Sequence, residues 1–93
     1  MIVSFRDQEA ARVMEREWSR RLPGEIQQTA LRKLLMLDAA VSLSDLNIPP
    51  ANRLEKLSGK RLGQYSIRIN DQWRICFRWD RGSAHDVEIT DYH

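Results

Sequence analysis

The sequence predicts a small α+β fold in which an N-terminal strand and a two-helix hairpin pack on one face of a curved antiparallel β-sheet. Apolar residues recur at helical spacing over residues 8–41, and they alternate with polar residues over residues 65–90. Residues 2–5 alternate as well and predict the first strand. A helix stripe and a sheet face that are both apolar are expected to cover each other. Because 93 residues support one core, we expect a single domain over residues 1–93.

The two helices follow directly after the first strand. Asp7 is a typical N-cap, and the first helix is predicted from residue 8 to about residue 21, with an apolar stripe made of Ala10, Ala11, Met14 and Trp18. A Pro-Gly pair at residues 23–24 interrupts the pattern. The second helix is predicted from about residue 25 to residue 41, and its apolar side carries Ile26, Ala30, Leu34, Leu37 and Val41.

The second half of the chain predicts a linker and a meander of three or four strands. Residues 42–52 contain prolines and turn formers, so we expect a linker with one helical turn that packs Leu43, Leu46 and Ile48 on the core. A turn at residues 70–71 joins two strands, and residues 80–83 lead into a last strand from about residue 85 to residue 90. The inward side chains are Tyr65, Ile67, Ile69, Trp73, Ile75, Phe77, Trp79, Val87 and Ile89.

The other face of the sheet is predicted to be open, polar and basic. It carries Ser66, Arg68, Arg74, Cys76 and Arg78, with Glu88 and Thr90 from the last strand. Residues 53–81 hold eight basic and three acidic residues, whereas the rest of the chain holds seven and ten, for a net charge of +2. Two interpretations stand side by side: a phosphate-binding surface, and a solvated face neutralised by Glu55, Asp71 and Glu88.

Composition excludes several classes of protein. The lone cysteine, Cys76, permits no intramolecular disulfide and offers no cluster of zinc ligands, which favours a reducing cytoplasm. The sequence has no apolar run long enough for a membrane span and no signal-peptide layout at its start. We therefore expect a cytoplasmic protein without membrane contact, metal or cofactor. The glycine-rich basic loop over residues 53–65 lacks Walker and Rossmann spacing, and it is either a phosphate-contacting loop or an ordinary hairpin connection.

The last three residues, Asp91, Tyr92 and His93, combine groups that can orient, donate and accept protons. Such groups suit cleavage of an RNA backbone, in which the 2′-hydroxyl loses a proton, attacks phosphorus and expels the 5′-oxygen. Arginines would neutralise the charge that develops, so no metal is required. The alternative interpretation is a set of surface residues at a frayed chain end.

Two stretches of the chain carry a likeness to a known family. They are the run Gly59-Lys-Arg-Leu-Gly-Gln-Tyr-Ser-Ile-Arg-Ile-Asn-Asp-Gln-Trp-Arg-Ile-Cys-Phe-Arg-Trp79 and the ending Val87-Glu-Ile-Thr-Asp-Tyr-His93. Together they closely resemble the HigB-type toxins of the RelE/ParE superfamily. The start Met1-Ile-Val-Ser-Phe and residues 37–46 are similar to that family too, so the likeness covers nearly the whole chain. Any one of these stretches alone would be weak evidence for the family. Their combination in one chain makes the likeness specific.

The resemblance implies a RelE-like fold and a type II toxin that inhibits translation as a ribosome-dependent mRNA interferase, a metal-independent endoribonuclease. It implies three partners: a HigA-like helix-turn-helix antitoxin, mRNA on the ribosome, and operator DNA reached through the antitoxin. By position, Arg74 matches the arginine that holds the RNA phosphate, and Asp91, Tyr92 and His93 match residues that contact and cleave mRNA. Further expected RNA contacts are Arg61, Arg68, Arg78, Lys60 and Lys56.

The sequence departs from the family's pattern in the loop before Gly59. Some members carry a catalytic histidine and lysine there, where this chain has Glu55 and Ser58. Glu55 is therefore a candidate base, although a carboxylate cannot donate a proton as an imidazolium does. Two other functions are consistent with the same fold and charge: a ParE-like inhibitor of DNA gyrase, and a non-catalytic nucleic-acid-binding module.

Overall fold

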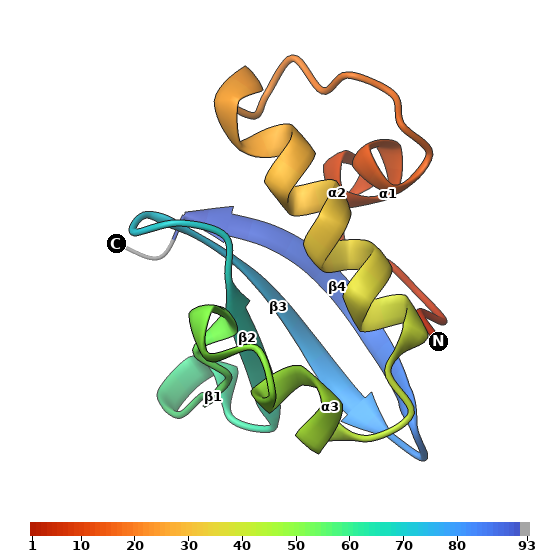
Figure 1. Cartoon of the computed structure of the whole chain (residues 1–93), viewed down its shortest axis with the longest axis vertical. Helices are drawn as coiled ribbons and strands as arrows, with labels where there is room; N and C mark the ends of the chain where they lie inside the picture. The colour runs from red at the N-terminus through yellow and green to blue at the C-terminus, as the bar shows by residue number, and fades with distance from the viewer. Residues whose placement is uncertain (92–93) are drawn as a thin grey trace.

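The computed structural model of the chain describes residues 1–91. Four antiparallel strands form one sheet in the order β1-β2-β3-β4, which confirms the predicted meander. Helices α1 and α2 lie on one side of the sheet and contact β4 (Figure 1). The elements are α1 (Gln8–Met14), α2 (Gly24–Ala39), α3 (Leu43–Asn47), η1 (Pro50–Asn52), β1 (Glu55–Lys56), η2 (Gly59–Arg61), β2 (Gln64–Arg68), β3 (Trp73–Asp80) and β4 (Ser83–Asp91).

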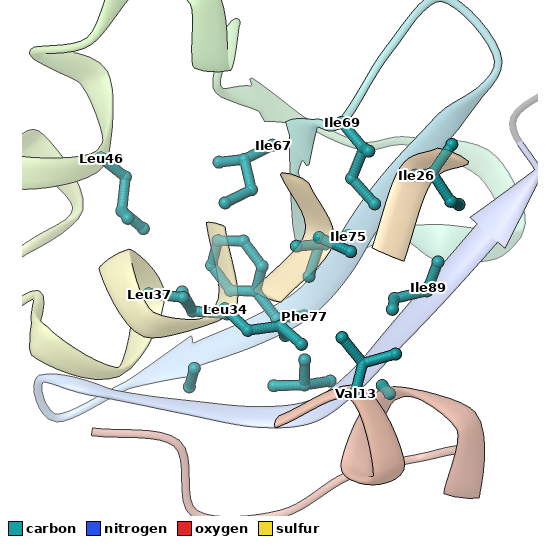
Figure 2. Packing of buried hydrophobic residues seen from close by; sticks show 14 of the residues in the cluster. Val13, Ile26, Leu34, Leu37, Leu46, Ile67, Ile69, Ile75, Phe77 and Ile89 are labelled. Atoms are coloured by element: carbon teal, nitrogen blue, oxygen red, sulfur yellow. The ribbon is translucent and has the colours of Figure 1, made fainter. Parts of the chain in front are cut away.

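The core lies between α2 and the inner face of the sheet, as the two apolar patterns predict. Figure 2 shows Leu34 and Leu37 of α2 over Ile75 and Phe77 of β3, with Ile67, Ile69 and Ile89 around them. Phe77 is fully buried and contacts the rings of Tyr65 and Trp79 at centroid distances of 6.2 and 6.3 Å. Burial of each large apolar side chain contributes about 1.5–3 kcal/mol, so this cluster is the main source of stability.

Helix α1 begins where predicted but ends at Met14, well before residue 21. The backbone amide of Glu17 donates to the Arg12 carbonyl at 2.8 Å, and that of Arg16 donates to the Val13 carbonyl at 2.9 Å. This pair of hydrogen bonds is a Schellman motif, in which Arg16 takes the left-handed conformation with φ of 61°. The predicted packing of Trp18 on this helix is therefore wrong, since Trp18 lies beyond the helix and is 69% exposed.

Two other apolar side chains predicted to be inside are exposed. Val41 is 78% exposed because α2 ends at Ala39 and Ala40 turns to extended backbone. Ile48, in the linker, is 75% exposed, whereas Leu46 of α3 is fully buried and Leu43 is partly buried, as expected. The linker thus contains α3 and η1 in place of a single helical turn.

Residues 2–5 do not form the predicted strand. They make two isolated parallel bridges with β4, one between Ile2 and Ala84 and one between Phe5 and Val87. Between these bridges, Asp86 has φ of 53° and the register of β4 against β3 shifts, so no continuous ladder forms. The segment still covers the outer edge of β4. Within residues 1–91, no helix has the length and apolar character that crossing a bilayer requires.

Asp7 links α1 to the sheet. Its Oδ1 accepts a hydrogen bond from the Ala10 amide at 2.6 Å, which is the predicted N-cap, and its Oδ2 accepts one from the Ile89 amide at 3.3 Å. Burial raises the pKa of the Asp7 carboxyl above its ordinary value of 3.8, and the two backbone hydrogen bonds lower it by less. One side chain therefore both starts the helix and joins it to β4.

We expect Asp7→Ala to lower the free energy of unfolding by about 0.5–2 kcal/mol, the usual cost of losing an N-cap side chain. Asp7→Asn keeps an acceptor and should cost less. Urea denaturation of both variants checks this, with the exposed neighbour change Gln8→Ala as control. An unfolding free energy for Asp7→Ala equal to that of the wild type would show that the cap contributes nothing.

The contribution of Asp7 to the free energy of unfolding is expected to depend on pH. A raised carboxyl pKa means that the folded state binds more protons than the unfolded state between pH 3.8 and the folded pKa. The stability contributed by Asp7 therefore falls as the pH rises through that window. The wild type should lose stability relative to Asp7→Asn over this interval.

Candidate functional site

The polar side chains gather on the sheet face opposite the helices, in two rows that cross the strands. One row is Glu55, Ser66, Cys76 and Glu88, and the next is Arg68, Arg74 and Thr90. Paired residues in an antiparallel sheet point to the same side, so the predicted sharing of one face is confirmed. The predicted openness of this face is wrong, because Ser66 and Cys76 are fully buried and Arg74 is only 7% exposed.

The segment over residues 57–63 explains the burial. Leu57 is buried and its amide donates to the Gln64 carbonyl at 2.9 Å. Arg61 then reaches across β3, where its Nη1 lies 2.7 Å from Oε1 of Glu88 on β4 and donates to Oε1 of Gln64 at 3.0 Å. Because Cys76 stands between Ser66 and Glu88 in the same row, this ion pair passes over the thiol.

Arg74 is a buried charged side chain of this face and is held by hydrogen bonds. Its Nε donates to Oγ of Ser66 at 2.7 Å, and its Nη2 donates to the carbonyls of Arg53 at 2.6 Å and Ser66 at 3.3 Å. Arg53 follows η1 in the left-handed conformation, with φ of 43°. Hydrogen bonds to a charged group contribute about 1.5–3 kcal/mol, enough to offset much of the desolvation of a guanidinium. The side chain is thus oriented before any ligand arrives.

A buried polar cluster fixes the segment that supplies the Arg53 carbonyl. Asn52 is fully buried; its Oδ1 accepts a hydrogen bond from Nζ of Lys33 on α2, and its Nδ2 donates to the Leu46 carbonyl at 3.0 Å. Burial lowers the pKa of the Lys33 ammonium from its ordinary value of 10.5, and the nearby charges of Arg32 and Arg68 lower it further. Helix α2 therefore helps to position Arg74 through η1.

The other arginines of the face are paired with carboxylates at the turns and edges. Arg68 forms an ion pair with Asp71, and Nε of Arg78 lies 3.5 Å from Oδ2 of Asp86. Glu88, expected to offset part of the charge, also holds Nε of Arg6 at 3.3 Å. Two of the three acids that the sequence suggested as neutralising groups, Asp71 and Glu88, thus pair with arginines, and Asp86 is a further partner. Exposed ion pairs contribute about 0–1 kcal/mol, so a phosphate can compete for them.

The loop before β2 forms the rim of the face. Lys56 and Lys60 are exposed, as is Ser58, and Glu55 stands directly opposite Ser66. Glu55 and the hydroxyl that binds Arg74 are therefore neighbours in the sheet. Gly63, with φ of 91°, lies against Arg78, because a side chain there would meet Nη1 at 3.0 Å. The structure thus brings this loop beside the arginines.

Asp91 lies at the end of β4, opposite Trp73. Side chains alternate along a strand, so Asp91 shares the face of Ile89 and not that of Thr90 and Arg74. Its Oδ2 accepts a hydrogen bond from Nε2 of Gln72 at 2.8 Å. Tyr92 and His93, the other two predicted catalytic residues, lie outside the described residues, and their role stays a prediction.

Cys76 is not an activated nucleophile. Burial raises the pKa of its thiol above the ordinary 9.0, outweighing the nearby charges of Arg61 and Arg74, so the thiol is protonated at neutral pH. Among residues 1–91, no three His, Cys, Asp or Glu side chains come together in a way that could hold a metal ion.

Sequence reasoning missed the groups that hold Arg74. Ser66 was placed on the correct face but not linked to Arg74, although the turn at residues 70–71 implies that register. The Arg53 carbonyl and the Asn52 cluster left no signal in the sequence, because they depend on long-range packing of η1 against α2.

Comparisons with known proteins identify the family to which the chain is similar. A family profile described as "RelE-like toxin of type II toxin-antitoxin system HigB" matches residues 3–93. The chain is 44% identical over 93 residues to Toxin HigB-1 of Vibrio cholerae, covering 99% of this chain and 98% of that protein. It is 29% identical over 93 residues to Endoribonuclease HigB of Proteus vulgaris, covering 100% of both.

Among solved structures, the fold is similar to that of a point mutant of YafQ from E. coli. The TM-score is 0.59 at 10% sequence identity, with 99% of this chain and 94% of that chain covered. At this identity the likeness concerns the fold alone.

The Ser66 hydroxyl should be essential to the position of Arg74. We expect Ser66→Ala to lower the free energy of unfolding by about 1–3 kcal/mol, because a buried guanidinium loses an acceptor. Chemical denaturation measures this, and Ser58→Ala, which removes an exposed hydroxyl from the adjoining loop, is the matched control. If both variants unfold alike, Arg74 does not depend on Ser66.

Proposed function

The chain belongs to the HigB-like family of RelE-like toxins of type II toxin-antitoxin systems, and we propose that it is an endoribonuclease that cleaves mRNA on the ribosome. The name of the Proteus vulgaris relative, Endoribonuclease HigB, supports this activity. The observation that carries the proposal is Arg74, a cation in the middle of a polar sheet face whose Nε and Nη2 donate hydrogen bonds to Ser66 and Arg53. Preorganised cations of this kind stabilise the charge that develops during phosphoryl transfer.

The proposed reaction is attack of a ribose 2′-oxygen on the neighbouring phosphorus. A base takes the 2′-proton, the new P–O bond forms, and the 5′-oxygen leaves with a proton from an acid. Arg74 neutralises the added negative charge on the non-bridging oxygens. His93 and Glu55 are the candidate bases and Tyr92 and His93 the candidate acids; Glu55 is supported by its place opposite Ser66. Asp91 is assigned a positioning role, since β4 turns it away from Arg74.

RNA binding would proceed by exchange of partners. Phosphates would replace Asp71 beside Arg68 and Asp86 beside Arg78, while Lys56 and Lys60 attract the strand along the rim. Arg61, whose Nη1 is held by Glu88 and Gln64, is a further expected RNA contact.

A type II toxin has an antitoxin partner. For this chain we propose the finer partners as well: a HigA-like helix-turn-helix antitoxin, operator DNA bound through that antitoxin, and mRNA on the ribosome, all in the cytoplasm. Residues 1–93 would act as one domain.

Arg74→Lys should reduce the rate of mRNA cleavage by about 10²–10³-fold, the range seen when a donor to a developing oxyanion is lost. Lysine keeps the charge but cannot reproduce the fork of donors that Ser66 and Arg53 hold. Primer extension on ribosome-bound mRNA measures the rate, with the exposed turn change Arg81→Lys as control. Cleavage by Arg74→Lys at the wild-type rate would remove Arg74 from the site.

His93→Ala and Glu55→Gln distinguish the two candidate bases. Loss of the base should lower the rate by about 10²–10⁴-fold and remove the acidic limb of the pH–rate profile. A residue is not the base if its replacement leaves both the rate and the acidic limb unchanged. If purified wild type leaves mRNA intact with ribosomes present, while its expression induces the SOS response, gyrase inhibition replaces the proposed activity.

A further inference from the structure

Trp18 projects into solvent from the segment that joins α1 to α2, and 69% of it is exposed. In Figure 1 this segment, drawn in orange, lies at the opposite end of the molecule from β1. The candidate RNA-cleaving face makes no use of it. Tryptophan is among the residues that contribute most to protein–protein interfaces, because its large apolar area becomes ordered at low entropic cost.

A buried polar cluster holds the backbone next to Trp18. The amide of Ser19 donates to Oε1 of Gln27 at 3.0 Å, and Nε2 of Gln27 donates to the carbonyls of Ser19 at 2.8 Å and Leu22 at 3.0 Å. Oγ of Ser19 also donates to Glu9 on α1. Ser19 and Gln27 are both buried, so the fold fixes the position from which Trp18 points outward. Such a preorganised anchor loses little entropy on binding.

Two hollows of different chemistry flank Trp18. One, of about 330 Å³, has apolar walls formed by Val13, Leu31 and Trp18 that suit an apolar side chain, and Arg16, Glu17, Gln27 and Gln28 complete its lining. The other, of about 500 Å³, is lined by three arginines, Arg12, Arg20 and Arg21, and by the acids Asp7 and Glu9. A hollow with apolar walls and a charged hollow thus share Trp18 as a lining residue.

The charged hollow is complementary to carboxylates. Asp7 already accepts hydrogen bonds from two backbone amides, and Glu9 accepts one from Ser19. Within residues 1–91, none of the three arginines forms an ion pair. Guanidinium groups in that state bind carboxylates through paired hydrogen bonds.

A polyanion fits this end of the molecule less well than a short acidic segment. Residues 7–25 carry four arginines and five acids (Asp7, Glu9, Glu15, Glu17 and Glu25), a net charge of −1. A nucleic acid running along residues 7–25 would meet all five acids, whereas one or two carboxylates entering the charged hollow would meet three arginines and only two acids, Asp7 and Glu9.

We propose that Trp18 and its two hollows bind an acidic segment of the protein antitoxin. An apolar side chain of that segment enters the hollow beside Val13 and Leu31, and neighbouring carboxylates pair with Arg12, Arg20 and Arg21. This proposal rests on the toxin-antitoxin pairing of the family and not on the cleavage chemistry.

The test is the affinity of purified antitoxin for Trp18→Ala, measured by isothermal titration calorimetry without RNA. We expect Kd to rise at least about 30-fold, as for a central interface residue, and Trp18→Phe to fall between. The matched control is Ile48→Ala, whose side chain is 75% exposed and lines neither hollow; its Kd should stay within about twofold. Thermal denaturation followed by circular dichroism confirms that each variant is folded.

A second variant tests the charge complementarity. Arg20→Gln combined with Arg21→Gln should weaken antitoxin binding about tenfold at low salt and less at high salt, because salt screens exposed pairs. A synthetic peptide copying the most acidic stretch of the antitoxin should compete with the whole antitoxin for the wild type and not for Trp18→Ala.

Three results would overturn the proposal. One is an unchanged antitoxin affinity of Trp18→Ala. Another is an unchanged antitoxin affinity with lost binding to ribosomes, which would assign Trp18 to an RNA-containing partner. The third is a change from dimer to monomer in sedimentation velocity with antitoxin binding intact, which would assign it to a second copy of the chain. None of these readings depends on whether the chain cleaves mRNA.

Discussion

The site depends on how the fold accommodates one buried guanidinium. Burial of a guanidinium requires hydrogen-bond acceptors in fixed places. Strand β2 supplies the Ser66 hydroxyl and carbonyl, and the turn after η1 supplies the Arg53 carbonyl. Lys33 of α2 holds that turn through Asn52, so the helix layer and the sheet layer both help to orient the Arg74 side chain.

Periodicity in the sequence was sufficient for the three long strands β2, β3 and β4, for most of α2 and for the division of the sheet into an apolar and a polar face, but not for residues 2–5 or for the short strand β1. Each inward residue from Tyr65 to Ile89 that the alternation predicted lies on the core side, because a period of two leaves only two choices. The type II toxin family was also predicted correctly from the motif around Arg74, and the family profile confirms it. The roles of Tyr92 and His93 stay predictions.

What the sequence did not predict depends on contacts between distant residues. The apolar spacing that ran on to Trp18 says nothing about Arg16, whose left-handed backbone ends α1, since a non-glycine residue in that position carries no signature. Likewise, the polar face was expected to be open because no pattern along the chain shows that Arg61 reaches across β3 to Glu88.

The pairing of Arg68 with Asp71 and of Arg78 with Asp86 has a consequence for selectivity. The salt dependence of nucleic-acid binding counts the small ions set free when cation and phosphate meet. A phosphate that displaces the carboxylate of Asp71 or Asp86 releases a group that stays attached to the protein, so no dissolved ion is released from that arginine. If RNA binds this face as proposed, its affinity would depend less steeply on ionic strength than it would with Arg68 and Arg78 unpaired, which would also disfavour adhesion to bulk cellular RNA.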